Sequence, residues 1–160
     1  ERLVATPLTR GDLVVGKALG TASVALGQVV LLAVIALALG WRPTPTLPGT
    51  LLVVVAAVLA MVCFASLALV LAGRLRAEAT LALANLVYLA VAAGGGIVLP
   101  VGSYPAWAQP VLTLLPFGAL GESLREWSTG ATPGPLALGV LLVWAVLSVL
   151  LARKAFRWTS

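Results

Sequence analysis

Four apolar runs, each about as long as a bilayer-spanning helix, constrain this chain more than any other feature. They occupy residues 14–40, 50–72, 80–99 and 136–152. A helix needs about 20 predominantly apolar residues to cross the hydrocarbon core of a bilayer. Charged residues make up only 9% of the chain, whereas soluble domains carry about a quarter. The pattern predicts an all-α polytopic membrane helix bundle with four transmembrane helices, folded as a single transmembrane domain over residues 1–160.

The stretch between the third and fourth runs, residues 101–135, is apolar but interrupted. Pro105, Pro110 and Pro116 divide it into pieces too short to cross a bilayer, although side chains such as Phe117 are strongly apolar. Segments of this kind dip into a membrane or lie on its surface. We therefore expect a re-entrant or amphipathic helical segment here.

Within that segment, residues 117–127 fit an amphipathic helix with Glu122, Arg125 and Glu126 on its wet side. Glu122 and Glu126 are one helical turn apart, a spacing that could also bring two carboxylates together for acid–base chemistry. On an exposed amphipathic face, we interpret them as a solvated edge of the helix.

The basic residues predict how the bundle is oriented. With both chain ends on one side of the membrane, eight lysines and arginines fall on that side and two on the other. Because cytoplasmic loops carry an excess of Lys and Arg, both ends are predicted to be cytoplasmic and residues 101–135 to face outward. Orientation explains these single and paired charges better than nucleic-acid binding does. The eight are Arg2, Arg10, Lys17, Arg74, Arg76, Arg153, Lys154 and Arg157, and the two are Arg42 and Arg125.

The residues before the first run predict a short polar helix, a proline elbow and a second helix. Pro7 disfavours helical angles at the preceding residue, so an amphipathic piece over residues 1–6 should stop there. Thr9 then offers an N-cap, with Asp12 three residues later as its capping-box partner. Two interpretations remain open: a docking surface on the water side of the membrane, or a juxtamembrane segment that only satisfies the charge rule.

Three polar side chains inside the predicted spans are candidates for lining a transport pathway. Gln28 is the one strongly polar side chain of the first span, where it serves an interhelical hydrogen bond or contacts substrate. Asn85 and Tyr88 are three residues apart and so share a face of the third span. They either pack against a neighbouring helix or face a pathway.

The sequence lacks the residues that most catalytic and energy-coupling sites require. It contains no histidine, and Cys63 is its only cysteine, which excludes histidine-based nucleophile activation and an internal disulfide. No ionisable side chain lies in the middle of an apolar run, so an ion-coupled relay is not expected. No phosphate-binding loop of the G-x-x-x-x-G-K-[ST] kind is present. We expect no catalytic residue, no metal site and no directly bound cofactor.

The order of these features resembles the membrane subunit of ABC transporters of the type-2 exporter class (ABC-2). Residues 1–10 (ERLVATPLTR), followed by Gly16-Lys17, are similar to the cytoplasmic loop that contains the family's coupling helix. Residues 94–100 resemble its glycine-to-proline exit from the fifth span, and residues 104–116 resemble its outward re-entrant segment. Residues 155–157 are similar to its basic cytoplasmic tail.

The resemblance implies a permease subunit of an ATP-driven exporter that moves drug-like or amphiphilic substrates out of the cell. Family members have six spans, so this chain would hold spans three to six and lack two N-terminal ones. ATP would be hydrolysed by a separate ATPase partner, and a second permease copy or homologue would complete a dimer. The expected location is the cell membrane, as in a bacterial inner or plasma membrane. The lipid bilayer is an expected partner, and nucleic acid is not.

The resemblance also assigns a role to the coupling segment, residues 1–13. Six of its residues would line the contact with the ATPase: Glu1, Arg2, Leu3, Thr6, Pro7 and Arg10. Two other functions stay open. One is export of lipid-linked polysaccharide, and the other is a membrane scaffold that transports nothing.

Overall fold

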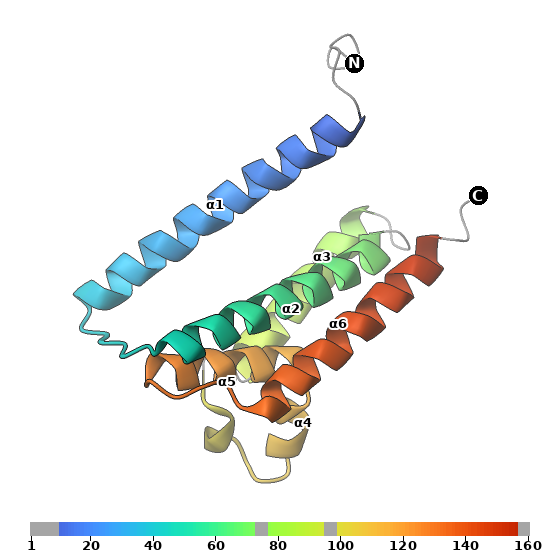
Figure 1. Ribbon diagram of the computed structural model, residues 1–160. Coiled ribbons are helices and arrows are strands. Elements are labelled where there is room, and N and C mark those ends of the chain that lie inside the picture. The colour runs from blue at the N-terminus through green and yellow to red at the C-terminus, as the bar shows by residue number, and fades with distance from the viewer. Residues whose placement is uncertain (1–9, 73–76, 95–98, 157–160) are drawn as a thin grey trace. The chain divides into compact units, whose positions relative to one another are not determined.

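The computed structural model (Figure 1) describes residues 10–72, 77–94 and 99–156. Throughout these residues the chain forms helices and connections and no strand, which confirms the all-α prediction. The elements in chain order are α1 (Arg10–Ala38), α2 (Leu47–Ala72), α3 (Ala77–Gly94), the 3-10 turn η2 (Val101–Ser103), α4 (Gln109–Thr113), α5 (Pro116–Ser128) and α6 (Pro135–Phe156).

The chain divides into two compact units, Glu1–Arg42 and Pro43–Ser160. The first contains α1, which ends two residues before the predicted limit of the first span. Gly40 adopts a left-handed φ of 98°. The Trp41 N–H donates to the Ala36 carbonyl at 2.9 Å, and the Gly40 N–H donates to the Leu37 carbonyl at 3.1 Å. This pair of bonds is a Schellman motif, which satisfies the last carbonyls and stops the helix.

In the second unit, α2 begins at Leu47, earlier than the predicted start at residue 50. The hydroxyl of Thr46 accepts the Gly49 N–H at 3.2 Å and so caps the first turn. Pro48 falls inside that turn, where its missing N–H costs nothing. The helix therefore includes residues 47–49, which precede the apolar run predicted to form the second span.

Helices α2 and α6 pack side by side and run in the same direction (Figure 1). Small side chains recur along the contact at intervals of three and four residues, so the two backbones can approach closely. Leu141 is the large side chain buried among them, with 0% of its surface exposed. The buried residues are Val53, Ala56, Ala60, Cys63 and Ser66 of α2, and Val140, Leu141, Ala145, Ser148 and Ala152 of α6.

Helix α5 crosses the ends at which α2 and α6 begin, and it contacts both of them (Figure 1). Its inner face consists of small residues, with Gly118, Ala119, Gly121 and Ser123 buried. The Ser123 hydroxyl satisfies itself by donating to the Ala119 carbonyl at 2.8 Å. A helix therefore covers the predicted residues 117–127, and its small face lets it lie against the α2–α6 pair.

Helices lie at all four positions of the predicted spans, but only two of them are long and apolar enough to cross a membrane within the described residues. These are Leu47–Leu71 of α2 and Pro135–Lys154 of α6. The apolar parts of the other two, Leu26–Ala38 and Glu78–Leu89, are shorter. α3 ends at Gly94, and residues 95–98 of the predicted third span lie outside the described residues. The number of spans stays a prediction.

Candidate functional site

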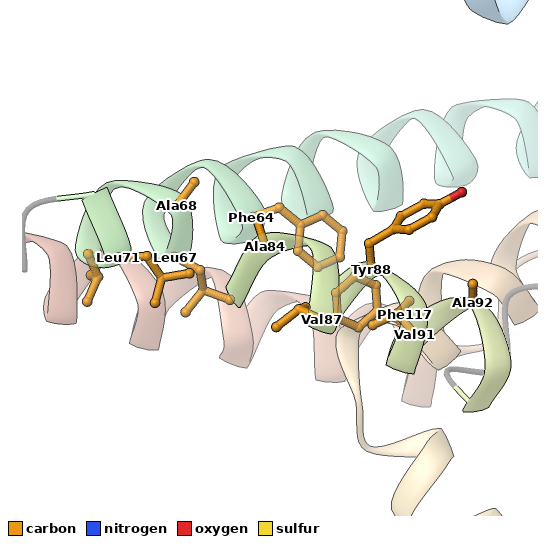
Figure 2. A pocket seen from close by; sticks show the side chains of 11 residues that line it. Phe64, Leu67, Ala68, Leu71, Ala84, Val87, Tyr88, Val91, Ala92 and Phe117 are labelled. Atoms are coloured by element: carbon orange, nitrogen blue, oxygen red, sulfur yellow. The ribbon is translucent and has the colours of Figure 1, made fainter. Parts of the chain in front are cut away.

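An open apolar groove of about 640 Å³ lies between α2 and α3, with α5 at one end (Figure 2). Side chains from all three helices line it, and the Tyr88 hydroxyl is the one polar side-chain atom among them. The chief lining residues are Phe64, Leu67 and Leu71 of α2, Tyr88 and Val91 of α3, and Phe117 of α5. The volume falls within the range of about 300–1,000 Å³ that is typical of small-molecule sites.

Two aromatic rings join α2 to α5 at this groove. Phe64 and Phe117 stack with their ring centroids 4.5 Å apart and their planes inclined by 16°. Such a pair contributes about 0.5–1.5 kcal/mol beyond the burial of its area. Phe117 is the second residue of α5, so the position of α5 determines where the pair stands. The sequence marked Phe117 as apolar but gave no signal for Phe64, because it lies inside an uninterrupted apolar run.

The three predicted pathway residues differ in whether they line the groove. Tyr88 lines the groove and is 70% exposed. Asn85 is also exposed on α3, but it is not among the lining residues. Gln28 is exposed on α1, which belongs to the other unit. Of the three, only Tyr88 takes part in the groove.

The predicted coupling residues fall at or beyond the edge of the described chain. Glu1, Arg2, Leu3, Thr6 and Pro7 lie outside the described residues. Arg10 is the first residue of α1. The proline elbow and its role therefore stay predictions.

The two carboxylates of α5 are partly exposed, and each also accepts a hydrogen bond from a distant backbone N–H, which the interpretation as a solvated edge did not include. One oxygen of Glu122 accepts the Val101 N–H at 2.9 Å, and one oxygen of Glu126 accepts the Gly134 N–H at 2.8 Å. Glu122 also pairs with Arg125 at 3.4 Å. Sequence separations of 21 and 8 residues made these partners invisible to a reading of helical spacing alone.

Two tryptophans complete the connections around α5. The Trp127 indole N–H donates to the Thr50 hydroxyl of α2 at 3.0 Å. The Trp144 indole N–H of α6 donates to the Leu114 carbonyl, just before α5, at 2.8 Å. A composition-based reading places tryptophan at the membrane interface, but only the fold shows which groups their N–H donors reach.

In the described part of the chain, no three His, Cys, Asp or Glu side chains gather in a way that could hold a metal ion. What the groove offers is apolar burial, aromatic faces and one hydroxyl. These features suit binding of an apolar or amphiphilic molecule.

Comparison with protein families gives a match that covers nearly the whole chain. Residues 1–154 match a family model described as ABC-2 family transporter protein. The matched region runs from the predicted coupling segment to the last turn of α6. Searches among curated proteins and among solved structures gave no match.

Proposed function

We propose that this chain is the membrane-spanning permease part of an ATP-driven exporter, because it belongs to the ABC-2 family of transporter proteins. Family membership and the long apolar helices α2 and α6 make it a multi-pass membrane protein. In our proposal both ends of the chain face the cytoplasm of a bacterial cell, a second permease copy or homologue completes the pathway, and α4 and α5 lie on the outer side.

The lining of the groove supports drug-like or amphiphilic cargo. Its side chains are apolar except for the Tyr88 hydroxyl. A polysaccharide carries many hydroxyl groups, and each one left without a hydrogen-bond partner costs free energy. Export of lipid-linked polysaccharide is therefore the second candidate for this groove. A scaffold without transport activity is the third.

The energy source in this proposal is a separate ATPase subunit, because the sequence has no phosphate-binding loop of its own. The six coupling residues, Glu1, Arg2, Leu3, Thr6, Pro7 and Arg10, would receive its movement. α1 follows directly after them and would carry that movement into the membrane.

The family match carries this proposal, and charge reversal at the coupling segment tests it. The double variant Arg2→Glu/Arg10→Glu would be placed in the full-length protein and reconstituted with its ATPase. We expect a loss of substrate-stimulated ATP hydrolysis, because the two positive charges that the ATPase would contact become negative. The variant Arg153→Glu/Lys154→Glu makes the same change in net charge at the end of α6 and should retain coupling. Unchanged coupling in the first variant would refute the assignment.

The groove is tested separately by equilibrium binding of the fluorescent amphiphile rhodamine 6G to the protein in nanodiscs. Phe117→Ala should weaken binding by about two- to tenfold, which corresponds to the loss of one aromatic contact. Tyr88→Phe keeps the ring and removes only the hydroxyl, so it measures the polar contribution. Leu142→Ala, on the exposed face of α6, is the matched control. Equal affinity in all variants would exclude this groove as the binding site.

A further inference from the structure

The chain that follows α3 begins its next turn with a backbone N–H that no local side chain satisfies. Val101 is the first residue of η2, and Pro100 before it provides no side-chain cap. N–H groups in the first turn of any helix lack partners inside the helix. Val101 is only 5% exposed, so water reaches it poorly. Its N–H is satisfied by Glu122 of α5, at 2.9 Å.

The start of α6 has the same deficiency and the same solution. Gly134 precedes Pro135, the first residue of α6, and has no side chain with which to cap it. Its N–H donates to Glu126 of α5 at 2.8 Å. In a capping box, a glutamate three residues into a helix accepts the N–H of its own N-cap residue. Here the glutamate comes from another helix.

Helix α5 is itself anchored by its own contacts, so it can support both the start of η2 and the start of α6. Ala119 and Ser123 are buried, at 2% and 0% exposure, in its contact with the neighbouring helices. At its C-terminal end, Trp127 bonds the Thr50 hydroxyl of α2. The Ser128 carbonyl accepts the Thr44 N–H at 3.1 Å. The two glutamates, one turn apart, therefore project from an anchored helix.

We propose that Glu122 and Glu126 are positioning residues that cap η2 and α6 from α5. Glu122 fixes the chain that leaves α3, and Glu126 fixes the outer start of α6. A carboxylate suits this task because hydrogen bonds to a charged acceptor are shorter and stronger than neutral ones. Arg125, 3.4 Å from Glu122, orients that carboxylate from one turn away.

The consequence for transport rests on the proposed function. Phe117 is on the same helix as both glutamates and stacks on Phe64 in the groove. Glu122 ties the chain after α3 to that helix, while α3 supplies the opposite wall with Tyr88. By holding Val101, seven residues after the end of α3 at Gly94, Glu122 would limit how far the two walls of the groove can separate. Its loss would let α3 move away from α5 without disturbing the α2–α6 contact.

The two glutamates test each other, because the same substitution one turn apart must affect different amides. The measurement is site-resolved hydrogen exchange of the full-length protein in lipid nanodiscs. Glu122→Ala should speed exchange of the Val101 amide by about tenfold or more, and leave the Gly134 amide unchanged. Glu126→Ala should do the reverse. Glu122→Gln and Glu126→Gln keep an acceptor oxygen and should restore most of the protection.

Exchange that is unchanged at both amides, or raised equally at both in each variant, would overturn the proposal. Equal increases at both amides would mean that the substitution had disrupted the packing of α5 as a whole. A transport assay with rhodamine 6G follows, in which Glu122→Ala should lose activity and Glu122→Gln should retain it. Selective exchange with full transport in Glu122→Ala would refute the link to the groove. A wild-type protein that transports nothing would instead refute the proposed function, and the exchange result would still decide the capping role.

Discussion

Leu141 is the best place to measure what holds this bundle together. It is the largest fully buried side chain of the described residues, with 0% exposure at the contact between α2 and α6. Around it, Ala56, Ala60 and Val140 are also buried. The perturbation is Leu141→Ala, which leaves a cavity that these small neighbours fill poorly.

The expected cost differs from that in a soluble protein because the reference state is a helix separated in lipid. In soluble cores Leu→Ala costs about 2.7–5.0 kcal/mol. Roughly 2.4 kcal/mol of this is the transfer from water of the three carbon atoms removed, at about 0.8 kcal/mol each. Lipid chains are as apolar as leucine, so that contribution nearly cancels in a membrane. Lost packing alone remains, and we expect Leu141→Ala to cost roughly 0.3–2.6 kcal/mol.

The assay is reversible unfolding in mixed micelles of a mild detergent and sodium dodecyl sulfate, followed by tryptophan fluorescence. Leu142→Ala is the matched control, since Leu142 is the next residue and is 52% exposed. It should change the free energy of unfolding by less than about 0.5 kcal/mol. A cost above about 4 kcal/mol for Leu141→Ala would show that water transfer still contributes. Equal costs for both variants would show that this contact is not the core of the bundle.

Three further predictions test the same packing. Cys63 is buried at 0% exposure, so a membrane-permeant maleimide should label it at least about tenfold more slowly in the folded protein than after denaturation. Mass spectrometry measures the two labelling rates, and equal rates would contradict the burial of Cys63. Ala60→Leu should destabilise the bundle by about 1–3 kcal/mol through overpacking, whereas Ala65→Leu on the exposed face of α2 should not; the unfolding assay above compares them. Trp127→Phe removes the donor to the Thr50 hydroxyl and should cost about 0.5–1.5 kcal/mol in that assay. Thr50→Val also removes the bond from the Thr50 hydroxyl to the Thr46 carbonyl, so it should cost at least as much, and the double variant should cost less than the sum of the two single variants.

The places where helices begin and end were only partly readable from the sequence. The second span was predicted to begin at residue 50, yet the Thr46 cap allows Pro48 inside the first turn, so α2 begins at Leu47. Gly40 was assigned to the first span, whereas its left-handed backbone ends α1 before it. Both differences follow from backbone hydrogen bonds at helix ends, which depend on individual caps and not on the average hydrophobicity of a run.

The candidate site was less predictable than the helices. Tyr88 was identified as a polar residue within an apolar run, and it lines the groove. Its partners across the groove are Phe64 of α2 and Phe117 of α5, which lie 24 and 29 residues from Tyr88 in the sequence (88 − 64 and 117 − 88). No local periodicity connects residues at such separations in the sequence. Whether they line one groove therefore depends on how α5 packs against α2.

Apolar length and the placement of charge are one-dimensional properties, and they alone determined that this chain is a helical membrane protein with an interrupted segment before its last helix. They are sufficient because each helix satisfies its own backbone hydrogen bonds. Which faces meet was decided only by the tertiary structure. The small residues of α2 and α6 come into register there, and the carboxylates of Glu122 and Glu126 find N–H donors on other segments. Those contacts form between parts of the chain whose separation leaves no periodic signal in the sequence.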